Sequence, residues 1–374
     1  MKHKYYVKVI LTLLVVMYLI GCDTYEPDYY WTKTVPYIFE GTYNLIKVPV
    51  PDGGIEFPIG IDDDETARVE KAFYIGETLV SRALWDTVAR WASEEKVFAR
   101  YRDVFYYHHH KDDDGLKRND NKLGMYGNLP IGQDDSFLYG NGRLGYNKNN
   151  NGLNTIPQWC NAYTEWYNEK HGTNFVPVYQ DIYGNPINIS AGSDYNLLDY
   201  INPDANGFRL PTAMEWELAA RWNGNISINT VTKTINGIDF SNQSIKFTTG
   251  RSASGGRKMV DDYNENNRVA VWKNNSKNID ESILEPSWIK DGYLAPVKSK
   301  EPNYLGIYDM SGNAMEHTNT YTPRTGNWLG GYRGGYQSKG GSFTSDFEDI
   351  AIGKLYEHGS VNSNFSFRLA RNAE

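Results

Sequence analysis

The chain has 374 residues, and its 46 Asp and Glu outnumber its 38 Lys and Arg to give a formal net charge of −8 at pH 7. Proteins that bind nucleic acid need clustered basic side chains to neutralise phosphates, so this acidic balance argues against a nucleic-acid partner. The two cysteines are Cys22, which falls in an export signal, and Cys160. One remaining cysteine cannot form an internal disulfide, so the hydrophobic core must hold the domain, with or without bound ions.

The N-terminus has the pattern of a bacterial export signal. A lysine-rich start precedes an apolar run, Val9 to Ile20, and Gly21 and Cys22 follow. Such an arrangement describes a signal peptide and is too short for a stable membrane span. Gly21-Cys22 resembles the lipobox of bacterial lipoproteins, so we expect residues 1–21 to be removed and Cys22 to be acylated. The alternative is an ordinary signal peptide with an incidental cysteine.

Acylation would fix where the protein resides. Buried acyl chains contribute about 0.8 kcal/mol per CH₂, so a multiply acylated Cys22 would hold the protein on a membrane without a spanning helix. We expect a lipoprotein of the outer membrane or cell surface, with residues 22–35 as a tether and residues 36–374 as one domain. Asp23 favours inner-membrane retention in some bacteria, so the leaflet stays open.

Hydrophobic spacing predicts a strand and two helices in the first half of the chain. Phe73 to Ile75 is the strand, and Val80 to Trp91 has a core-facing apolar stripe at helical spacing. The second helix, Pro157 to His171, begins at a proline suited to a first turn and stops before Gly172. Cys160 lies within this helix, so we interpret it as a small buried residue and not as a nucleophile.

A long stretch between these helices lacks hydrophobic periodicity. Phe105 to Asn154 contains His108-His109-His110 followed by Asp112 to Asp114, and segments of this length inside a compact domain are usually functional or mobile loops. The cluster from His108 to His110 could bind a transition metal. Adjacent residues in a loop do not set ligand geometry, however, and a solvated loop explains the same residues.

The segment Asn206 to Arg221 has a clear helix start. Thr212 followed by Glu215 forms a capping box, in which each side chain satisfies a backbone amide of the other residue. Glu215, Glu217 and Arg221 could serve as acid–base groups, but capping and buried ion pairs explain them better. Short strands are expected in the polar segment that follows, Asn223 to Gly256.

The segment Pro302 to His317 combines a tight turn with oxygen ligands. Gly312 and Asn313 both tolerate positive φ, and Asp309 and Glu316 flank the turn. Calcium needs about 6 to 8 oxygen ligands from carboxylates, carbonyls and water, which such a loop can supply. A turn with hydrogen-bonded carboxylates is the alternative.

Several segments resemble the formylglycine-generating-enzyme, or sulfatase-modifying-factor, family, and they follow one another along the chain in the same order as in that family. They are Trp159–Trp166 (WCNAYTEW), Asn206–Arg221 (NGFRLPTAMEWELAAR), Val269–Ser276 (VAVWKNNS), Pro302–His317 (PNYLGIYDMSGNAMEH), Lys339–Phe343 (KGGSF) and Phe365–Arg371 (FSFRLAR). The resemblance implies a loop-rich α+β domain with the C-type-lectin-like fold of this family. It also implies that a glycine-containing hairpin within Val48 to Ile59 opens the fold. Family positions further place structural calcium at Asp309, Gly312, Ala314 and Glu316.

The resemblance locates the catalytic residues of the enzymatic members. In those proteins, two cysteines after the Gly-Gly-Ser motif bind copper and activate oxygen, converting a substrate cysteine to formylglycine. Alignment on residues 340–342 places Ser345 and Ile350 at the two positions. Neither supplies a thiolate, the soft ligand that Cu(I) requires, and Cys160 is in a different element. We therefore expect no copper and no formylglycine-generating activity.

The alternative function is a divergent oxygenase-type enzyme with non-haem iron, as in other branches of the family. Such a centre normally needs two histidines and a carboxylate. Apart from the cluster at residues 108–110, the mature chain offers His171, His317 and His358, which is weak support. His317 replaces a tryptophan common in the family, so an unusual site there stays open.

The C-terminal segment predicts a different role. Residues 344–363 depart from the family pattern although framework matches flank them, as expected for a recognition surface carried on a scaffold. The layout resembles the variable proteins of diversity-generating retroelements, which include treponemal lipoproteins; family drift in a loop is the alternative. We expect a monomer that binds a protein or a glycan. The expected contact residues are Trp328, Tyr332, Thr344, Ser345, Phe347, Asp349, Gly353, Lys354, Leu355, Tyr356 and His358.

Overall fold

The computed structural model describes residues 42–94, 130, 155–187, 197–276, 294–323, 334–358 and 365–373. All of these residues belong to one compact unit, Tyr37–Glu374. The predicted lipidation site Cys22, the cluster from His108 to His110, and the expected contact residues Trp328 and Tyr332 lie outside the described residues.

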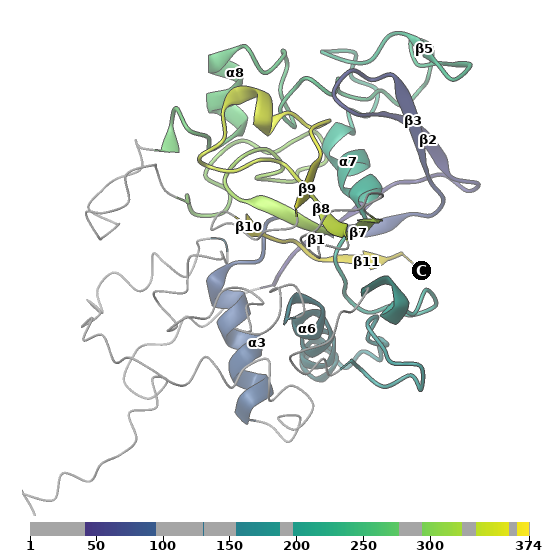
Figure 1. The fold of residues 1–374 in the computed structure, drawn as a ribbon, viewed down its shortest axis with the longest axis vertical. Coiled ribbons are helices and arrows are strands. Elements are labelled where there is room, and N and C mark those ends of the chain that lie inside the picture. The colour runs from purple at the N-terminus through teal and green to yellow at the C-terminus, as the bar shows by residue number, and fades with distance from the viewer. Residues whose placement is uncertain are drawn as a thin grey trace, which may run out of the picture. The chain divides into compact units, whose positions relative to one another are not determined.

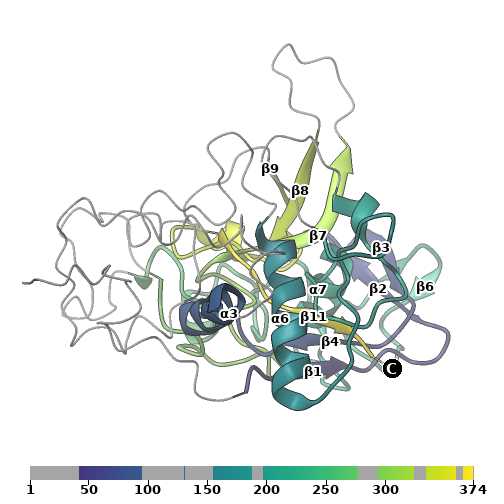
Figure 2. The same cartoon turned by 90° about the horizontal axis from the view of Figure 1, so that it is seen from below.

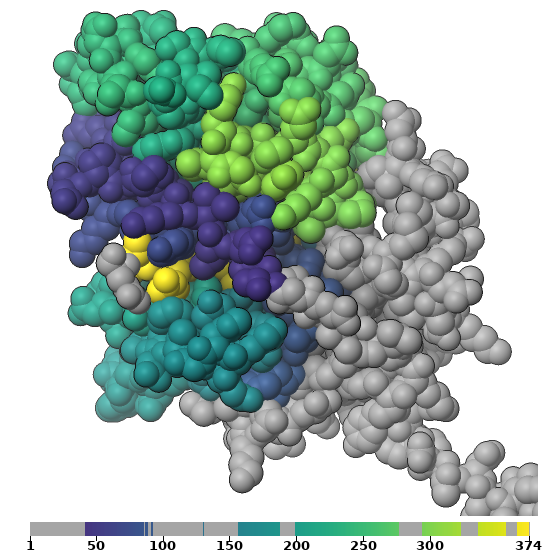
Figure 3. All heavy atoms as spheres, turned by 180° about the vertical axis from the view of Figure 1, so that it is seen from behind, coloured from purple at the N-terminus to yellow at the C-terminus, as the bar shows by residue number. Residues whose placement is uncertain are grey.

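A three-stranded antiparallel sheet joins the two ends of the domain. β4 (Phe73–Gly76) is its central strand, with β1 (Leu45–Val48) on one side and β11 (Ala370–Asn372) on the other. Figure 3 shows these opening strands in purple next to the yellow C-terminal residues. The strand expected at Phe73 to Ile75 is confirmed.

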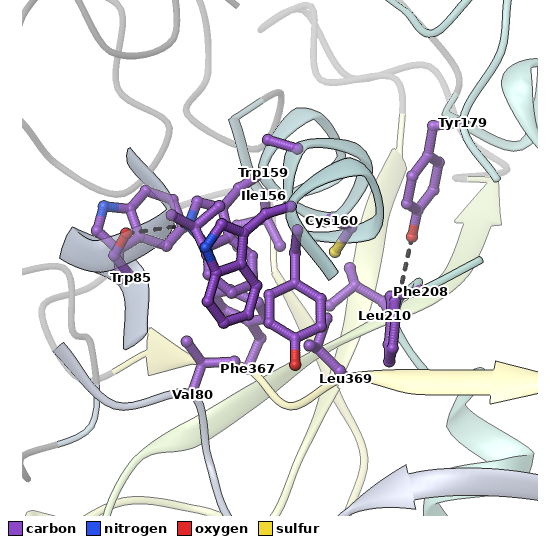
Figure 4. Packing of buried hydrophobic residues seen from close by; sticks show 14 of the residues in the cluster. Val80, Trp85, Ile156, Trp159, Cys160, Tyr179, Phe208, Leu210, Phe367 and Leu369 are labelled. Carbon is purple, nitrogen blue, oxygen red and sulfur yellow. Dashed lines mark hydrogen bonds between the residues drawn. The ribbon is translucent and has the colours of Figure 1, made fainter. Parts of the chain in front are cut away.

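Two helices cover one side of this sheet with an aromatic core. They are α3 (Arg82–Glu94) and α6 (Thr155–His171), which lie side by side in Figure 1. The Trp85 and Trp159 rings stack with centroids 5.1 Å apart, and Phe367 meets Trp159 edge to face at 5.5 Å (Figure 4). Cys160 is fully buried among these residues, and burial raises the pKa of its thiol, so its expected structural role is confirmed.

Helix α7 (Ala213–Arg221) packs on the other side through a second core that includes Val48, Ile75 and Trp216. Its start matches the sequence prediction. The Glu215 amide donates to Thr212 Oγ1 at 3.1 Å, and the Thr212 amide donates to Glu215 Oε2 at 2.8 Å. The predicted capping box is therefore confirmed, and it fixes the entry of α7 into the core.

The opening hairpin differs from the prediction. β1 pairs with β4, and β2 (Ile55–Ile59) pairs instead with β3 (Glu65–Val69). The segment Val48 to Ile59 thus contains a turn between strands of two different sheets and not a hairpin of its own. Short strands are confirmed in the polar segment, where β5 (Thr234–Ile235) pairs with β6 (Ile238–Asp239).

A second sheet carries the closing part of the chain. Figure 2 shows β7, β8 and β9 side by side, and β10 pairs with the start of β7. Three short helices complete the described elements: η4, α8 and η7. The ranges are Met315–Pro323 (β7), Gly334–Lys339 (β8), Tyr356–His358 (β9), Phe365–Ser366 (β10), Leu197–Tyr200 (η4), Tyr263–Val269 (α8) and Phe347–Ile350 (η7).

These small sheets and short helices, joined by long connections, confirm the expected loop-rich α+β class. Within the described residues, no helix has both the length and the apolar character that crossing a membrane requires.

Candidate functional site: a buried signature turn and the segment it supports

The signature turn, by which we mean residues 309–316, folds as Gly312 and Asn313 predict. Gly312 and Asn313 have φ of 72° and 58°, and Asp309 has φ of 57°. A Cβ on Gly312 would collide with the carbonyl oxygen of Val271, so this position requires glycine. The Asn313 amide donates to that same Val271 oxygen at 2.7 Å, which ties the turn to the residues after α8.

Both carboxylates that flank the turn are buried. Glu316 is 0% exposed, and Arg368 donates to it from Nε at 2.6 Å and from Nη2 at 2.7 Å. Burial alone lowers the pKa of Arg368, but the adjacent Glu316 carboxylate raises it, so the guanidinium stays charged. Asp309 accepts from the Lys298 amide at 3.0 Å, and burial raises its pKa to about 6.

These contacts bear on the calcium expectation. Arg368 takes both oxygens of Glu316, so this carboxylate already has a cationic partner, which does not fit a role as a calcium ligand in the described arrangement. Asp309 and Gly312 do lie on the same buried turn, whereas Ala314, also buried, leads into β7. Calcium at Asp309, Gly312, Ala314 and Glu316 stays a prediction, tested by chelation as described below.

The glutamates of α7 also form buried ion pairs that hold the domain together. Lys339 Nζ lies 2.6 Å from Glu217 Oε2, and Arg221 Nε donates to Glu217 Oε1 at 2.9 Å. Glu215 binds Arg209 through two hydrogen bonds of 2.7 Å. The predicted structural role of these carboxylates, capping and buried ion pairing, is therefore confirmed.

The expected recognition segment is anchored to this framework by its middle. Ile350, Ala351 and Ile352 are each 0% exposed. The Ile350 carbonyl accepts from Ser311 Oγ at 2.8 Å, and the Ile352 amide donates to the Ser252 carbonyl at 2.9 Å. The segment therefore crosses a rigid base, and its two flanks reach the surface.

Several predicted contact residues lie on those flanks. The side chains of Asp349 and Lys354 are each 41% exposed and lie 3.4 Å apart, and Leu355 is 38% exposed. Phe347 is half-buried at the start of η7. Tyr356 donates from its hydroxyl to the Asp349 carbonyl at 2.9 Å, which fixes the bend between the two flanks.

The remaining predicted contact residues within the described ranges are Thr344, Ser345, Gly353 and His358. Thr344 and Ser345 are half-buried, and Ser345 Oγ accepts from the Ser342 amide at 2.9 Å. Gly353 is the one correction: it is buried, and a Cβ there would collide with the Gly60 carbonyl oxygen. It therefore contacts the framework and not a ligand. His358 ends β9, and its side chain is outside the described set.

The two positions that the family resemblance assigns to the catalytic cysteines hold Ser345 and Ile350. Ile350 is fully buried against the core near Trp272, and Ser345 forms a turn hydrogen bond. Cys160 belongs to the separate core of α3 and α6. A thiolate pair cannot be assembled from these residues.

The histidines that the structure describes give little support to the alternative of a non-haem-iron oxygenase. His317 is 5% exposed, its ring stacks on Phe365 at 4.7 Å, and its Nδ1 lies 3.4 Å from Ser338 Oγ. Across the part of the chain that the structure describes, no group of three or more His, Cys, Asp or Glu is arranged to hold a metal.

One surface next to the segment was missed by the sequence analysis. Tyr263, at the start of α8, is 51% exposed and lies 6.5 Å from the Phe347 ring. Asp262 caps α8 and is followed by Glu265, a sequence signal that could have located the helix start. No local pattern, however, places Tyr263 beside Phe347, because their contact depends on the tertiary fold.

The comparisons with known proteins agree with this architecture. A family model described as a sulfatase-modifying factor enzyme 1-like domain matches residues 158–373. The chain is similar to Treponema denticola variable protein 1, with 19% identity and a TM-score of 0.50, over 89% of this chain and 98% of that one. It is also similar to CarF, with 21% identity and a TM-score of 0.53, over 89% of this chain and 99% of the other. At these identities the likeness shows the fold, and it confirms the expected C-type-lectin-like fold of the formylglycine-generating type.

One curated relative matches part of the chain. The chaperone protein LppX of Paenibacillus barcinonensis is 34% identical over 161 residues, which are 41% of this chain and 44% of the relative. The chain thus spans less than half the length of that relative.

Proposed function

The chain belongs to the family of sulfatase-modifying factor enzyme 1-like domains, and from this premise we propose that it is a binding member of the family without its oxidase activity. In this proposal the protein is a surface-displayed lipoprotein anchored at Cys22. Its scaffold presents the exposed flanks of residues 344–358 to a ligand, and this segment differs between variants of the protein.

The observation that carries the proposal is the chemistry of the two cysteine positions. Copper-dependent oxidation in the enzymatic members requires thiolates, and this chain has Ser345 and Ile350 there. A serine hydroxyl is a hard, weak ligand, and a fully buried isoleucine offers no donor atom. In this proposal, a rigid base without a redox centre takes the place of the copper site.

The packing of the segment supports binding. Its middle is fixed by the buried residues 350–352, while the side chains of Asp349, Lys354 and Leu355 are exposed by 38% to 41%. Side chains can change on such flanks without disturbing the base, since exposed substitutions usually alter the free energy of unfolding by less than about 0.5 kcal/mol. This separation of base and surface is what a scaffold for variable recognition needs.

The names of similar proteins are consistent with the proposal. One neighbour in fold is named a variable protein, and the partial relative is named a chaperone. Each name bears on this chain only as support for the proposal.

The test is an oxidation assay on the purified full chain. The protein is incubated in air with copper and a cysteine-containing peptide, and aldehyde formation is followed by mass spectrometry, with metal content measured on the same sample. We expect no aldehyde above the blank and no stoichiometric copper or iron. Turnover that disappears in Cys160→Ala or in His317→Ala would overturn the proposal and favour the oxygenase alternative.

A further inference from the structure

Five Asn-Gly pairs occur in the sequence, and the structure describes three of them, at residues 206–207, 223–224 and 236–237. In such a pair the backbone nitrogen of the glycine can attack the side-chain carbonyl carbon of the asparagine, because glycine has no Cβ to obstruct the approach. Asparagine is thermolabile for this reason. Which of the three pairs reacts depends on how firmly the fold holds the two reacting groups.

Two of the described pairs are held by the framework. Asn223 is 0% exposed, and its Nδ2 donates to the Ile228 carbonyl at 2.9 Å. Asn206 Oδ1 accepts from the Val176 amide at 2.8 Å, and the Gly207 amide donates to the Val176 carbonyl at 2.9 Å. Reaction at Gly207 needs both the asparagine side chain and the glycine amide, so it would break both hydrogen bonds. The fold therefore protects these two pairs.

The third pair lies at the tip of the β5–β6 hairpin, beside β3 (Figure 1). Asn236 and Gly237 are both exposed, with φ of 51° and 83°, which suit these residues in a two-residue hairpin turn. Among the described residues the Gly237 amide makes no backbone hydrogen bond, and the space beside its Cα is open. The flanking strands have two residues each, so the turn opens more easily than the interior.

One hydrogen bond restrains the Asn236 side chain. Its Nδ2 donates to Thr66 Oγ1 of β3 at 3.1 Å. The contact is exposed to water, which can replace it, so it restrains the reacting carbon much less than burial does at Asn223.

We propose that Asn236 is a site of spontaneous deamidation in the folded protein. Hydroxide removes the proton of the Gly237 amide, and the nitrogen forms a bond to Asn236 Cγ. The side-chain nitrogen takes up a proton from water and leaves as ammonia. Water then opens the resulting five-membered imide, which gives aspartate at one carbonyl and isoaspartate at the other. No electrons are transferred, and the inference is independent of the proposed binding function.

The modification changes how the hairpin contacts β3. Either product replaces the amide that donates to Thr66 by a carboxylate, and Thr66 follows the exposed acidic side chain of Glu65. Isoaspartate also lengthens the main chain by one methylene, which a two-residue hairpin turn does not accommodate. The modified chain should therefore lose this contact between the β5–β6 turn and β3.

The test incubates the purified full chain at pH 7 and at pH 9 and locates deamidated peptides by mass spectrometry. We expect Asn236 to react at least about tenfold faster than Asn206 and Asn223, because those two sites must first open. The rate should rise at pH 9, since the attacking nitrogen must lose its proton. Asn236→Gln should abolish the reaction at this position.

A threonine variant tests the restraint on the side chain. Thr66→Val removes the acceptor and should accelerate reaction at Asn236 roughly two- to tenfold, the equivalent of one net hydrogen bond. Thr232→Val, at an exposed position of the segment that leads into the hairpin, is the matched control and should leave the rate unchanged. In concentrated urea the rates at the three asparagines should converge, because the fold no longer separates them.

The contrary outcomes are equally specific. Similar rates at the three pairs in the folded chain, or no reaction at Asn236, would overturn the proposal, as would a ranking that persists in urea. An unchanged rate in Thr66→Val would contradict the assigned restraint. If Thr66→Val accelerates all three pairs alike, the variant has loosened the whole domain, and the ranking in the wild type decides.

Discussion

Glu316 and Asp346 each pair with a cation, but the two pairs lie in opposite surroundings. Both side chains of the Glu316–Arg368 pair are 0% exposed, whereas the Asp346 and Lys273 side chains are 62% and 53% exposed. A buried charge that loses its partner has no water to replace it, whereas an exposed charge is solvated at once. The comparison indicates that charges in the signature turn hold the scaffold, while those beside η7 can be exchanged freely.

Removal of the buried Arg368 cation should have the largest effect on the free energy of unfolding. Arg368→Met leaves Glu316 buried without its partner, so we expect the free energy of unfolding to fall by about 3–5 kcal/mol. Denaturant unfolding followed by circular dichroism measures the change. The double variant Glu316→Leu/Arg368→Met should recover much of the loss, because it removes both charges. A loss below about 1 kcal/mol in the single variant would show that the pair does not hold the scaffold.

The Glu215–Arg209 pair should make stability depend on pH. Burial alone raises the pKa of Glu215, but Arg209 and the cap hydrogen bonds lower it below its usual value of 4.5. A carboxylate with a lowered pKa stabilises the folded state above its unfolded pKa, and this contribution is lost as pH falls through the folded pKa. Glu215→Gln should therefore cost about 2 kcal/mol at pH 7 and less at pH 3.

The control for this experiment is Glu348→Gln, which changes an exposed carboxylate of η7. Its effect on unfolding should be small at both pH values. An equal cost of Glu215→Gln at pH 7 and pH 3 would contradict the assigned role of the Glu215 charge.

The exposed Lys273–Asp346 pair should contribute little to the free energy of unfolding. Lys273→Met removes the partner of Asp346, and we expect a change of at most about 0.5 kcal/mol in the free energy of unfolding, reduced further by salt. Thermal unfolding at low and high ionic strength measures it. A cost comparable to that of Arg368→Met would erase the distinction between framework and surface charges.

Calcium removal should have the smallest effect. A bound ion stabilises only the folded state, so chelation lowers the melting temperature if the turn holds calcium. Because Arg368 already neutralises Glu316, the predicted ion would be bound weakly, so we expect EGTA to lower the melting temperature by only about 2 °C. A larger shift that is absent in Asp309→Asn would place a calcium ion at the turn and require Glu316 to rearrange.

Local signals predicted the framework well. The capping box at Thr212, the turn at Gly312 and the helix that buries Cys160 each depend on residues within a few positions of one another. The pairing of β2 with β3 was missed, because strand pairing depends on partners that periodicity does not specify. The burial of Gly353 against Gly60 was missed for the same reason.

The arrangement of the proposed recognition surface could be predicted only in part from the sequence. Departure from the family pattern singled out residues 344–363 as the expected recognition segment, yet it gave no means to separate the buried Ile350 from the exposed Leu355. The neighbouring Tyr263 lies far away in sequence, and only the fold brings it to Phe347.

The most direct test is saturation mutagenesis of residues 340–358, with protease resistance of the displayed full chain as the measure of folding. The account predicts that the exposed positions Asp349, Lys354 and Leu355 accept most amino acids. Residues 350–353 should accept almost none besides small or apolar ones that fit. A segment that tolerates change equally at buried and exposed positions, or that rejects it throughout, would contradict the account.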